Sequence, residues 1–189
     1  MNLKDLDYEI PKELIALKPM RPRDKSNLLI AGKKNRIVTF ENLVEELKPN
    51  DALILNNTKV IKAYLKGLTN GRKISINLNK LENSKKNIWS VFIKSKGKVL
   101  EGDKIILFES YYAKVISVKK TENQKTYFLE FNISISSFKK KIEKYGMTPL
   151  PPYIKKRGCF NSDLLDYQTV FAEEEGAVAA PTASLHFTN

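Results

Sequence analysis

The sequence predicts an α/β domain that is interrupted by a small antiparallel β-barrel. A short, fully apolar run at residues 51–57, "DALILNN", is typical of a strand in the centre of an α/β sheet. Five or six short alternating segments then follow one another at regular spacing from Ala63 to Phe131, which is the pattern of a small barrel. We therefore expect a first part of the α/β domain at 1–62, the barrel at 63–146 and a second α/β part at 147–189.

The first part carries signals for two short helices and a hairpin. In "DYEIPKELIA", Pro11 opens a helix where its missing N–H has no cost. The apolar runs at 28–30 and 37–40 flank the turn "AGKKNR" and predict a hairpin. "ENLVEELKP" predicts a brief helix that ends at Pro49, with three apolar side chains on one face: Leu43, Val44 and Leu47.

The polar run after the apolar strand is a candidate binding site. "NNTKV" places Asn56, Asn57, Thr58 and Lys59 at the carboxyl end of that strand, where open α/β sheets bind ligands. Strand ends are also where polar turn residues collect, so this position alone decides nothing.

The middle of the chain alternates as barrel strands do. "NG" at 70–71 is a hairpin signal, and "EGD" at 101–103 predicts a further turn. After the last strand, "SISSFKKKIEKYG" predicts a helix with Phe138, Ile142 and Tyr145 on one stripe, which Gly146 closes.

The composition indicates a cytoplasmic protein with a basic surface. Lys and Arg number 33 against 21 Asp and Glu, a net charge of +12, which suits a polyanion such as tRNA but also fits a lysine-biased genome. No apolar stretch approaches the roughly 20 residues of a membrane span, and the N-terminus has no signal-peptide pattern. The single cysteine, Cys159, forms neither an internal disulfide nor a metal cluster.

Two segments combine cationic residues with prolines. In "PMRPRDKSNLL", Arg21, Arg23 and Lys25 surround Asp24, which makes either an oxyanion clamp or a solvated loop. In "TPLPPYIKKR", three prolines favour an extended segment. It reads as a rigid crossover, as a single-stranded RNA contact, or as both. The groups that would meet RNA are Tyr153, Lys155, Lys156 and Arg157.

The segment "DYQTVFAEEEGAVAAPTASLHFT" is the least ordinary in the chain. Its small residues at 176–180 would let a nucleoside lie against the main chain. His186, the only histidine, is either a structural residue or an acid/base group. A nucleophilic dyad with Cys159 has no support from the spacing.

These blocks together resemble one family. "DYEIPKELIA", "PRDKSNLL", "NNTKVI", "TPLPPYIKKR" and "GAVAAPTASLHFT" occur in the order and spacing of the S-adenosylmethionine:tRNA ribosyltransferase-isomerases of queuosine biosynthesis. The resemblance implies an α/β domain interrupted by a β-barrel. It also implies transfer and isomerisation of the ribosyl moiety of S-adenosylmethionine onto 7-aminomethyl-7-deazaguanine at the tRNA wobble position. The products would be epoxyqueuosine-tRNA, adenine and methionine.

The resemblance also marks residues for the site. His186 and Thr182 are expected to be catalytic. Substrate binding is expected from Arg23, Asp24, Asn56, Thr58, Tyr153, Gln168, Thr169, Gly176 and Phe187, and RNA binding from Lys155, Lys156 and Arg157. S-adenosylmethionine would be a co-substrate and no metal would be needed, because the cationic sulfur already withdraws electrons. We expect a monomer that binds tRNA and does not associate with a membrane.

Departures from the family pattern temper these expectations. Asn57 replaces an acid, Lys59 and Tyr64 replace arginines, Asn27 stands at another usual arginine, and Ser184 replaces a glycine. Serine would be strained there if that glycine has positive φ. Relatives also continue for more than a hundred residues past "LHFT". We therefore expect the C-terminal part of the α/β domain to be missing or supplied by a separate chain. The alternative function is a truncated, inactive tRNA-binding fragment or a decayed gene product.

Overall fold

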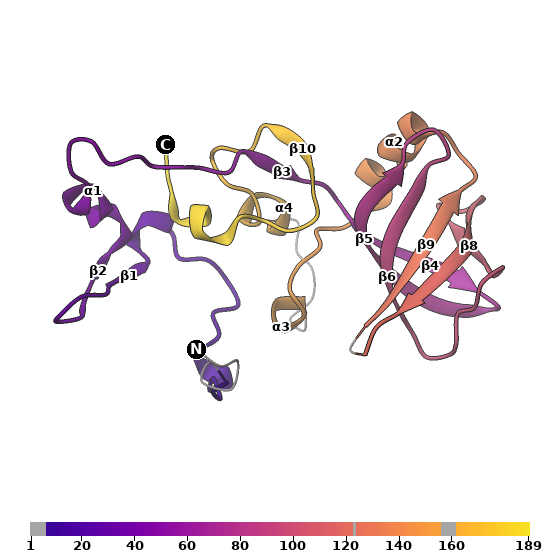
Figure 1. Ribbon diagram of the computed structural model, residues 1–189, viewed down its shortest axis with the longest axis horizontal. Coiled ribbons are helices and arrows are strands. Elements are labelled where there is room, and N and C mark those ends of the chain that lie inside the picture. The colour runs from indigo at the N-terminus through magenta and orange to yellow at the C-terminus, as the bar shows by residue number, and fades with distance from the viewer. Residues whose placement is uncertain (1–6, 123, 156–161) are drawn as a thin grey trace.

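The computed structural model describes residues 7–122, 124–155 and 162–189. The chain has two regions, with a barrel at one end and a looser α/β region at the other (Figure 1). The α/β region is built from segments before and after the barrel, so the predicted fold class is confirmed.

The N-terminal segments form short elements. The 3₁₀ turn η2 (Lys12–Leu14) follows Pro11, and η3 (Arg23–Lys25) precedes the predicted hairpin of β1 (Asn27–Ile30) and β2 (Arg36–Thr39), which is confirmed as an antiparallel pair. The predicted helix also exists, as η4 (Phe40–Asn42) followed by α1 (Leu43–Glu46). Its expected apolar face is not buried, because Val44 is 75% exposed and Leu47 is 42% exposed.

The predicted central strand "DALILNN" is wrong. Residues 51–57 have no strand assignment, and Leu53, Ile54 and Leu55 are 52%, 93% and 39% exposed. A strand needs neighbours that bond its backbone and a layer that covers its side chains. Strand pairing starts directly after this run, at β3 (Thr58–Val60), which runs parallel to β10 (Glu174–Ala177).

The predicted barrel is confirmed as a closed sheet of six strands. In chain order they are β4 (Tyr64–Thr69), β5 (Arg72–Asn83), β6 (Ile88–Ser95), β7 (Lys104–Leu107), β8 (Tyr111–Lys120) and β9 (Lys125–Phe131). They close in the order β4-β5-β6-β9-β8-β7. The predicted "NG" turn joins β4 to β5, with φ of 49° at Asn70 and 72° at Gly71.

Helix α2 (Ile135–Tyr145) closes one end of the barrel core. Ser134 caps it by accepting a bond from the Ser137 amide, and the fully buried Phe138 ring lies 4.3 Å from Phe131 and 5.8 Å from Trp89. Gly146 ends the helix as predicted, but with φ of −74° rather than the left-handed conformation. A Cβ there would lie 2.3 Å from the Lys62 carbonyl oxygen, so glycine is needed for close approach.

The chain leaves the barrel beside the point where it enters. Tyr64 and Met147 exchange backbone hydrogen bonds of 3.0 and 2.9 Å. A second, small core follows in the α/β region, where Val60, Leu150, Tyr167 and Ala180 are buried together.

The proline-rich crossover is not fully extended. Helix α3 (Pro152–Lys155) begins at the second of two adjacent prolines, whose fixed φ suits a first helical position. The expectation of a polyproline-like segment is therefore wrong from Pro152 onward. The last elements are α4 (Asp163–Asp166), β10 and the 3₁₀ helix η5 (Thr182–His186).

Candidate functional site

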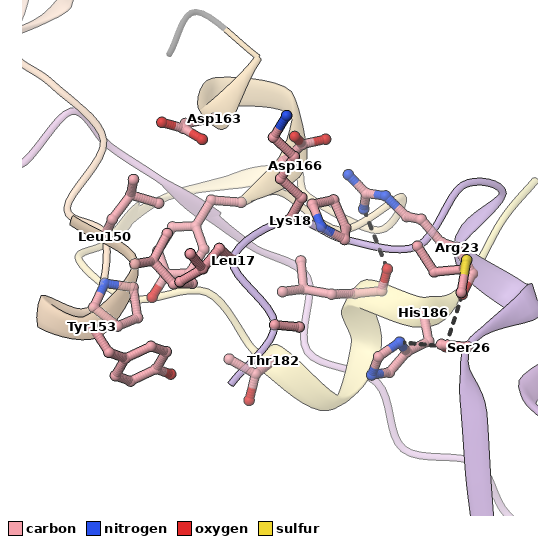
Figure 2. A pocket seen from close by; sticks show the side chains of 17 residues that line it. Leu17, Lys18, Arg23, Ser26, Leu150, Tyr153, Asp163, Asp166, Thr182 and His186 are labelled. Carbon is pink, nitrogen blue, oxygen red and sulfur yellow. Dashed lines mark hydrogen bonds between the residues drawn. The ribbon is translucent and has the colours of Figure 1, made fainter. Parts of the chain in front are cut away.

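A cavity of about 570 Å³ lies where three distant parts of the sequence meet (Figure 2). Its volume is within the range of small-molecule sites. The lining residues are Ala16, Leu17, Lys18, Pro19, Met20, Arg23 and Ser26 from the N-terminal segment; Leu150, Pro151, Tyr153, Ile154, Asp163, Asp166 and Tyr167 from the segment after the barrel; and Thr182, Leu185 and His186 from η5.

His186 is held in place by a hydroxyl. Its Nδ1 lies 2.8 Å from Ser26 Oγ, and Ser26 Oγ donates to the Arg23 carbonyl over 2.8 Å. A serine hydroxyl has one hydrogen, so we assign Nδ1 as the donor to Ser26. The Phe40 ring packs 5.4 Å from the imidazole. This arrangement leaves Nε2 as the basic nitrogen of the ring.

Arg23 is held by the protein's own main chain. Its guanidinium donates to the Leu165 carbonyl over 2.6 Å and to the Gln168 carbonyl over 2.7 Å, with a longer bond of 3.4 Å to Leu185. These bonds join η3 to the segments around α4 and η5. Arg23 therefore builds the cavity wall, since its donors are directed at carbonyl groups.

Two carboxylates lie on another side of the cavity. Asp163 is 1% exposed, and Asp166, one turn later on α4, forms an ion pair with Arg21. Carboxylates in a partly desolvated cavity favour a cationic ligand.

Two tyrosines add aromatic surface to the cavity. Tyr153 is 49% exposed, whereas Tyr167 is 8% exposed. Burial raises the pKa of the Tyr167 hydroxyl above its ordinary value, and nearby Tyr153 raises it further. A hydrogen bond with the Ala180 backbone lowers this pKa, but by less than burial raises it. Tyr167 is therefore a neutral phenol near pH 7. The faces of such rings suit a purine base or a cation.

The structure brings four predicted site residues to this cavity, namely Arg23, Tyr153, Thr182 and His186. Sequence reasoning missed Ser26, Asp163, Asp166 and Tyr167. Only Asp163 stood outside the quoted motifs, whereas Ser26 stood within "PRDKSNLL" and both Asp166 and Tyr167 stood within "DYQTV" without being chosen.

The remaining predicted substrate residues make structural contacts outside the cavity lining. Gln168 acts as a strand neighbour, because its Oε1 accepts from the Val60 amide over 3.0 Å and its Nε2 donates to the Val60 carbonyl over 2.7 Å. Asn56 Oδ1 accepts from the Thr58 amide and hydroxyl in a local turn. Gly176 has φ of 140° at an irregularity in the β3–β10 pairing.

Three further predicted residues, Phe187, Asp24 and Thr169, also lie outside the cavity lining. Phe187 packs edge-on against Phe40 at 4.9 Å and Phe171 at 5.2 Å. Asp24 accepts a bond of 2.9 Å from Thr188, and its buried Oδ1 has no hydrogen-bond partner among the described residues. Thr169 is 6% exposed, and in the part of the chain that the structure describes its buried hydroxyl also has no hydrogen-bond partner.

The predicted RNA-binding residues cannot be placed in the same way. Lys156 and Arg157 lie outside the described residues, as does Cys159, and only the backbone of Lys155 is described, within α3. The role of these residues stays a prediction.

The departure at Ser184 has no strain. Ser184 lies within η5 and is not among the residues with positive φ, so a side chain fits its backbone conformation. Within the described ranges, no group of three or more His, Cys, Asp and Glu is placed to hold a metal ion. No helix in the described part of the chain is long and apolar enough to cross a membrane.

Comparison with known proteins agrees with the resemblance seen in the sequence. A family model described as "Queuosine biosynthesis protein" matches residues 3–189, and the chain therefore belongs to this family. It is 40% identical over its whole length to the S-adenosylmethionine:tRNA ribosyltransferase-isomerase of Sulfurihydrogenibium sp. and 43% identical to that of Thermosipho africanus. It spans 55% and 54% of those two proteins, so it is about half the length of these relatives.

A solved structure is also similar. The S-adenosylmethionine tRNA ribosyltransferase of Thermotoga maritima is 29% identical, with a TM-score of 0.37, over 80% of this chain and 52% of that one.

Proposed function

We propose that the cavity beside His186 binds S-adenosylmethionine for ribosyl transfer to a tRNA. The observation that carries this proposal is the convergence of Arg23, Tyr153, Thr182 and His186, from three family-like motifs, on one cavity of about 570 Å³. The relatives named above are S-adenosylmethionine:tRNA ribosyltransferase-isomerases, which agrees with this assignment.

The chemistry of the ligand matches the cavity. S-adenosylmethionine has a sulfonium and an ammonium group, and the cavity wall at α4 carries the carboxylates of Asp163 and Asp166, of which Asp166 also pairs with Arg21. Its adenine offers a flat face to Tyr153 and Tyr167. Arg23, by tying η3 to the other two segments, keeps the cavity assembled.

His186 is the proposed acid/base group. The positive sulfur acidifies the protons on the adjacent ribose carbon, and Nε2 is the basic nitrogen that can accept one. Ser26 positions the ring through Nδ1. Rearrangement of the sugar releases adenine and methionine, while the aminomethyl nitrogen of the 7-deazaguanine bonds to the anomeric carbon and the product is epoxyqueuosine-tRNA. Thr182, at the start of η5, lies on the same wall and would orient the sugar.

Adenine release tests this function. The purified chain is incubated with S-adenosylmethionine and tRNA that carries 7-aminomethyl-7-deazaguanine, and free adenine is measured by chromatography. His186→Ala should abolish release. Thr188→Ala, two residues away and bonded to Asp24 outside the cavity, should retain it. Equal release from wild type and His186→Ala would remove His186 from the mechanism.

Binding can be followed separately from chemistry. His186 is the only histidine, so the imidazole gives one set of NMR signals. S-adenosylmethionine should shift these signals, and the absence of any shift at saturating ligand would contradict the cavity assignment.

The second candidate function is tRNA binding without catalysis. It is favoured by the net charge of +12, which suits a polyanion such as tRNA. Binding of tRNA without adenine release would support this candidate. As a protein that acts on tRNA, the chain would work in the cytoplasm, without a membrane or a metal, and as a monomer by size-exclusion chromatography.

A further inference from the structure

A second cavity, of about 690 Å³, lies on the barrel and away from the residues around His186. Strands β4, β5, β6 and β7 contribute to it, and its cationic lining residues are Lys66, Lys73, Lys94 and Lys96. We call this cavity the lysine groove. The motifs of the sequence analysis did not include these residues.

Strand register places the lysines in neighbouring rows. Lys66 pairs with Ser75, and Ser75 pairs with Lys94, so Lys66 and Lys94 lie on either side of Ser75 across three strands. Leu68 pairs with Lys73 in the next outward row of β4 and β5. Adjacent strands are about 4.8 Å apart and same-face residues about 6.8 Å apart along a strand. The lysines therefore form a cluster on one face rather than a scatter around the barrel.

These lysines lack acidic partners. All four are exposed, and none forms an ion pair with a carboxylate of the described residues. Glu109 is the single acidic residue among the groove's lining residues. From residue 64 to 131 the chain has 14 Lys and Arg against 6 Asp and Glu, a net charge of +8. A polyanion that binds here would neutralise this excess and release counterions.

The floor of the groove is apolar and lies at the seam where the barrel closes. Strands β4 and β7 pair only at Leu68 and Ile106, and these side chains are 43% and 51% exposed. Tyr64 lines the same groove. Phe108 also lines it, and apolar and aromatic side chains beside cationic ones suit a nucleic acid strand, whose bases have apolar faces and whose backbone is anionic.

We propose that the lysine groove binds the sugar-phosphate backbone of the tRNA. This inference rests on the proposed function for the identity of the RNA, and it assigns a contact surface separate from the cavity beside His186. Lysine charge would contact phosphates, and the apolar floor would lie beneath the sugars and bases.

The test compares two triple variants with equal charge change. One is Lys66→Gln, Lys73→Gln and Lys94→Gln in the groove. The matched control changes Lys119, Lys120 and Lys125 to Gln at the far ends of β8 and β9, where no lining residue of the groove lies. The probe is an unmodified tRNA transcript, titrated by fluorescence anisotropy at salt concentrations from 50 to 200 mM. Circular dichroism and thermal unfolding check that both variants fold.

The groove variant should lose affinity on the order of 100-fold at 0.1 M salt, because each phosphate contact adds about 0.7 to 0.9 to the slope of log affinity against log salt. That slope should fall by about 2 to 3 in the groove variant, since three contacts are lost, whereas the control should lose less than about 5-fold. Equal losses in the two variants, or no loss in the groove variant, would overturn the proposal.

Adenine release separates this proposal from the proposed function. If wild type binds tRNA through the groove but releases no adenine, the groove stands and the catalytic proposal fails. If wild type and the groove variant release adenine at the same rate with tRNA below saturation, the groove proposal fails and the catalytic one stands.

Discussion

Replacement of Arg23 by alanine should loosen the segments that form the cavity wall. The two short bonds from its guanidinium, 2.6 Å to the Leu165 carbonyl and 2.7 Å to the Gln168 carbonyl, each belong to a class with a net contribution of about 1.5–3 kcal/mol. Arg23 is only half-buried, so water offsets part of this contribution. We expect a loss of about 2–4 kcal/mol in the local stability of residues 163–187.

Hydrogen exchange followed by mass spectrometry measures this effect where it occurs. A loss of about 3 kcal/mol corresponds to roughly 150-fold faster exchange in peptides from residues 163–187, since 1.4 kcal/mol is a factor of ten. Peptides from the barrel should exchange as in wild type. Arg23→Lys should recover little, because an ammonium group lacks the planar fork that reaches two separate carbonyls.

Arg36→Ala is the matched control. Arg36 pairs with Glu46 at the surface of the hairpin region, where an ion pair contributes under about 1 kcal/mol. Unchanged exchange at 163–187 in Arg23→Ala, together with loss of S-adenosylmethionine binding, would refute the structural role and make Arg23 a ligand group.

Three other perturbations have defined outcomes. Phe138→Ala should destabilise the barrel by about 3–5 kcal/mol in urea unfolding followed by tryptophan fluorescence, because the ring is fully buried; a loss below 1 kcal/mol would contradict the packing. Gly146→Ala should lower the melting temperature more than Gly32→Ala. A Cβ at Gly146 would overlap the carbonyl oxygens of Lys62 and Ile142, whereas a Cβ at Gly32 would have its nearest neighbour, the Lys34 carbonyl oxygen, at 3.9 Å. Equal shifts would show that no close approach exists at Gly146. Glu41→Gln should destabilise the chain at pH 7 but not in acid. The Lys25 hydrogen bond lowers the pKa of the Glu41 carboxyl from 4.5, so its stabilisation is present above that value and is lost as pH falls through the lowered one. Because the pKa of Lys25 is raised, the ion pair persists up to the ordinary lysine value of 10.5 and is lost as pH rises further. Urea titrations from pH 3 to 8 measure the difference in free energy of unfolding between wild type and Glu41→Gln. A difference that stays constant over this range would contradict the assignment.

The barrel could be predicted because its signals are local. Strand alternation and the Asn70–Gly71 turn act within a few residues of sequence, and the six strands then satisfy one another's hydrogen bonds in a closed sheet. The buried face of α2 could also be predicted, because Phe138 and Ile142 are one turn apart in the sequence, and both are buried.

The strand at 51–57 could not be judged from its own residues. An apolar run predicts burial only if another part of the protein covers it, and Ile54 is 93% exposed in the described structure. The same limit applies to Val44 on α1. Apolar sequence indicates what a segment tends to bury, while the available partners decide whether it does.

The site was predictable as a set of motifs but not as a set of roles. The family-like blocks led to His186, Thr182, Tyr153 and Arg23, which line one cavity. Gln168 stood in the same blocks, yet its amide pairs with the Val60 backbone. A side chain that substitutes for a strand neighbour has no sequence pattern of its own, because the need arises only when β3 has been placed.

The pair of hydrogen bonds between Tyr64 and Met147 has a consequence for how the barrel relates to the rest of the chain. It fastens both ends of the segment from 64 to 147 at one point, so the host region meets the barrel as it would meet a short loop. Such an insertion adds little closure entropy to the host. The segment should therefore be separable by two cuts, and we propose the boundaries 62/63 and 146/147 as the places to divide the chain. A host with a short linker across that point would keep its own connectivity, and the barrel could pass between proteins as a module.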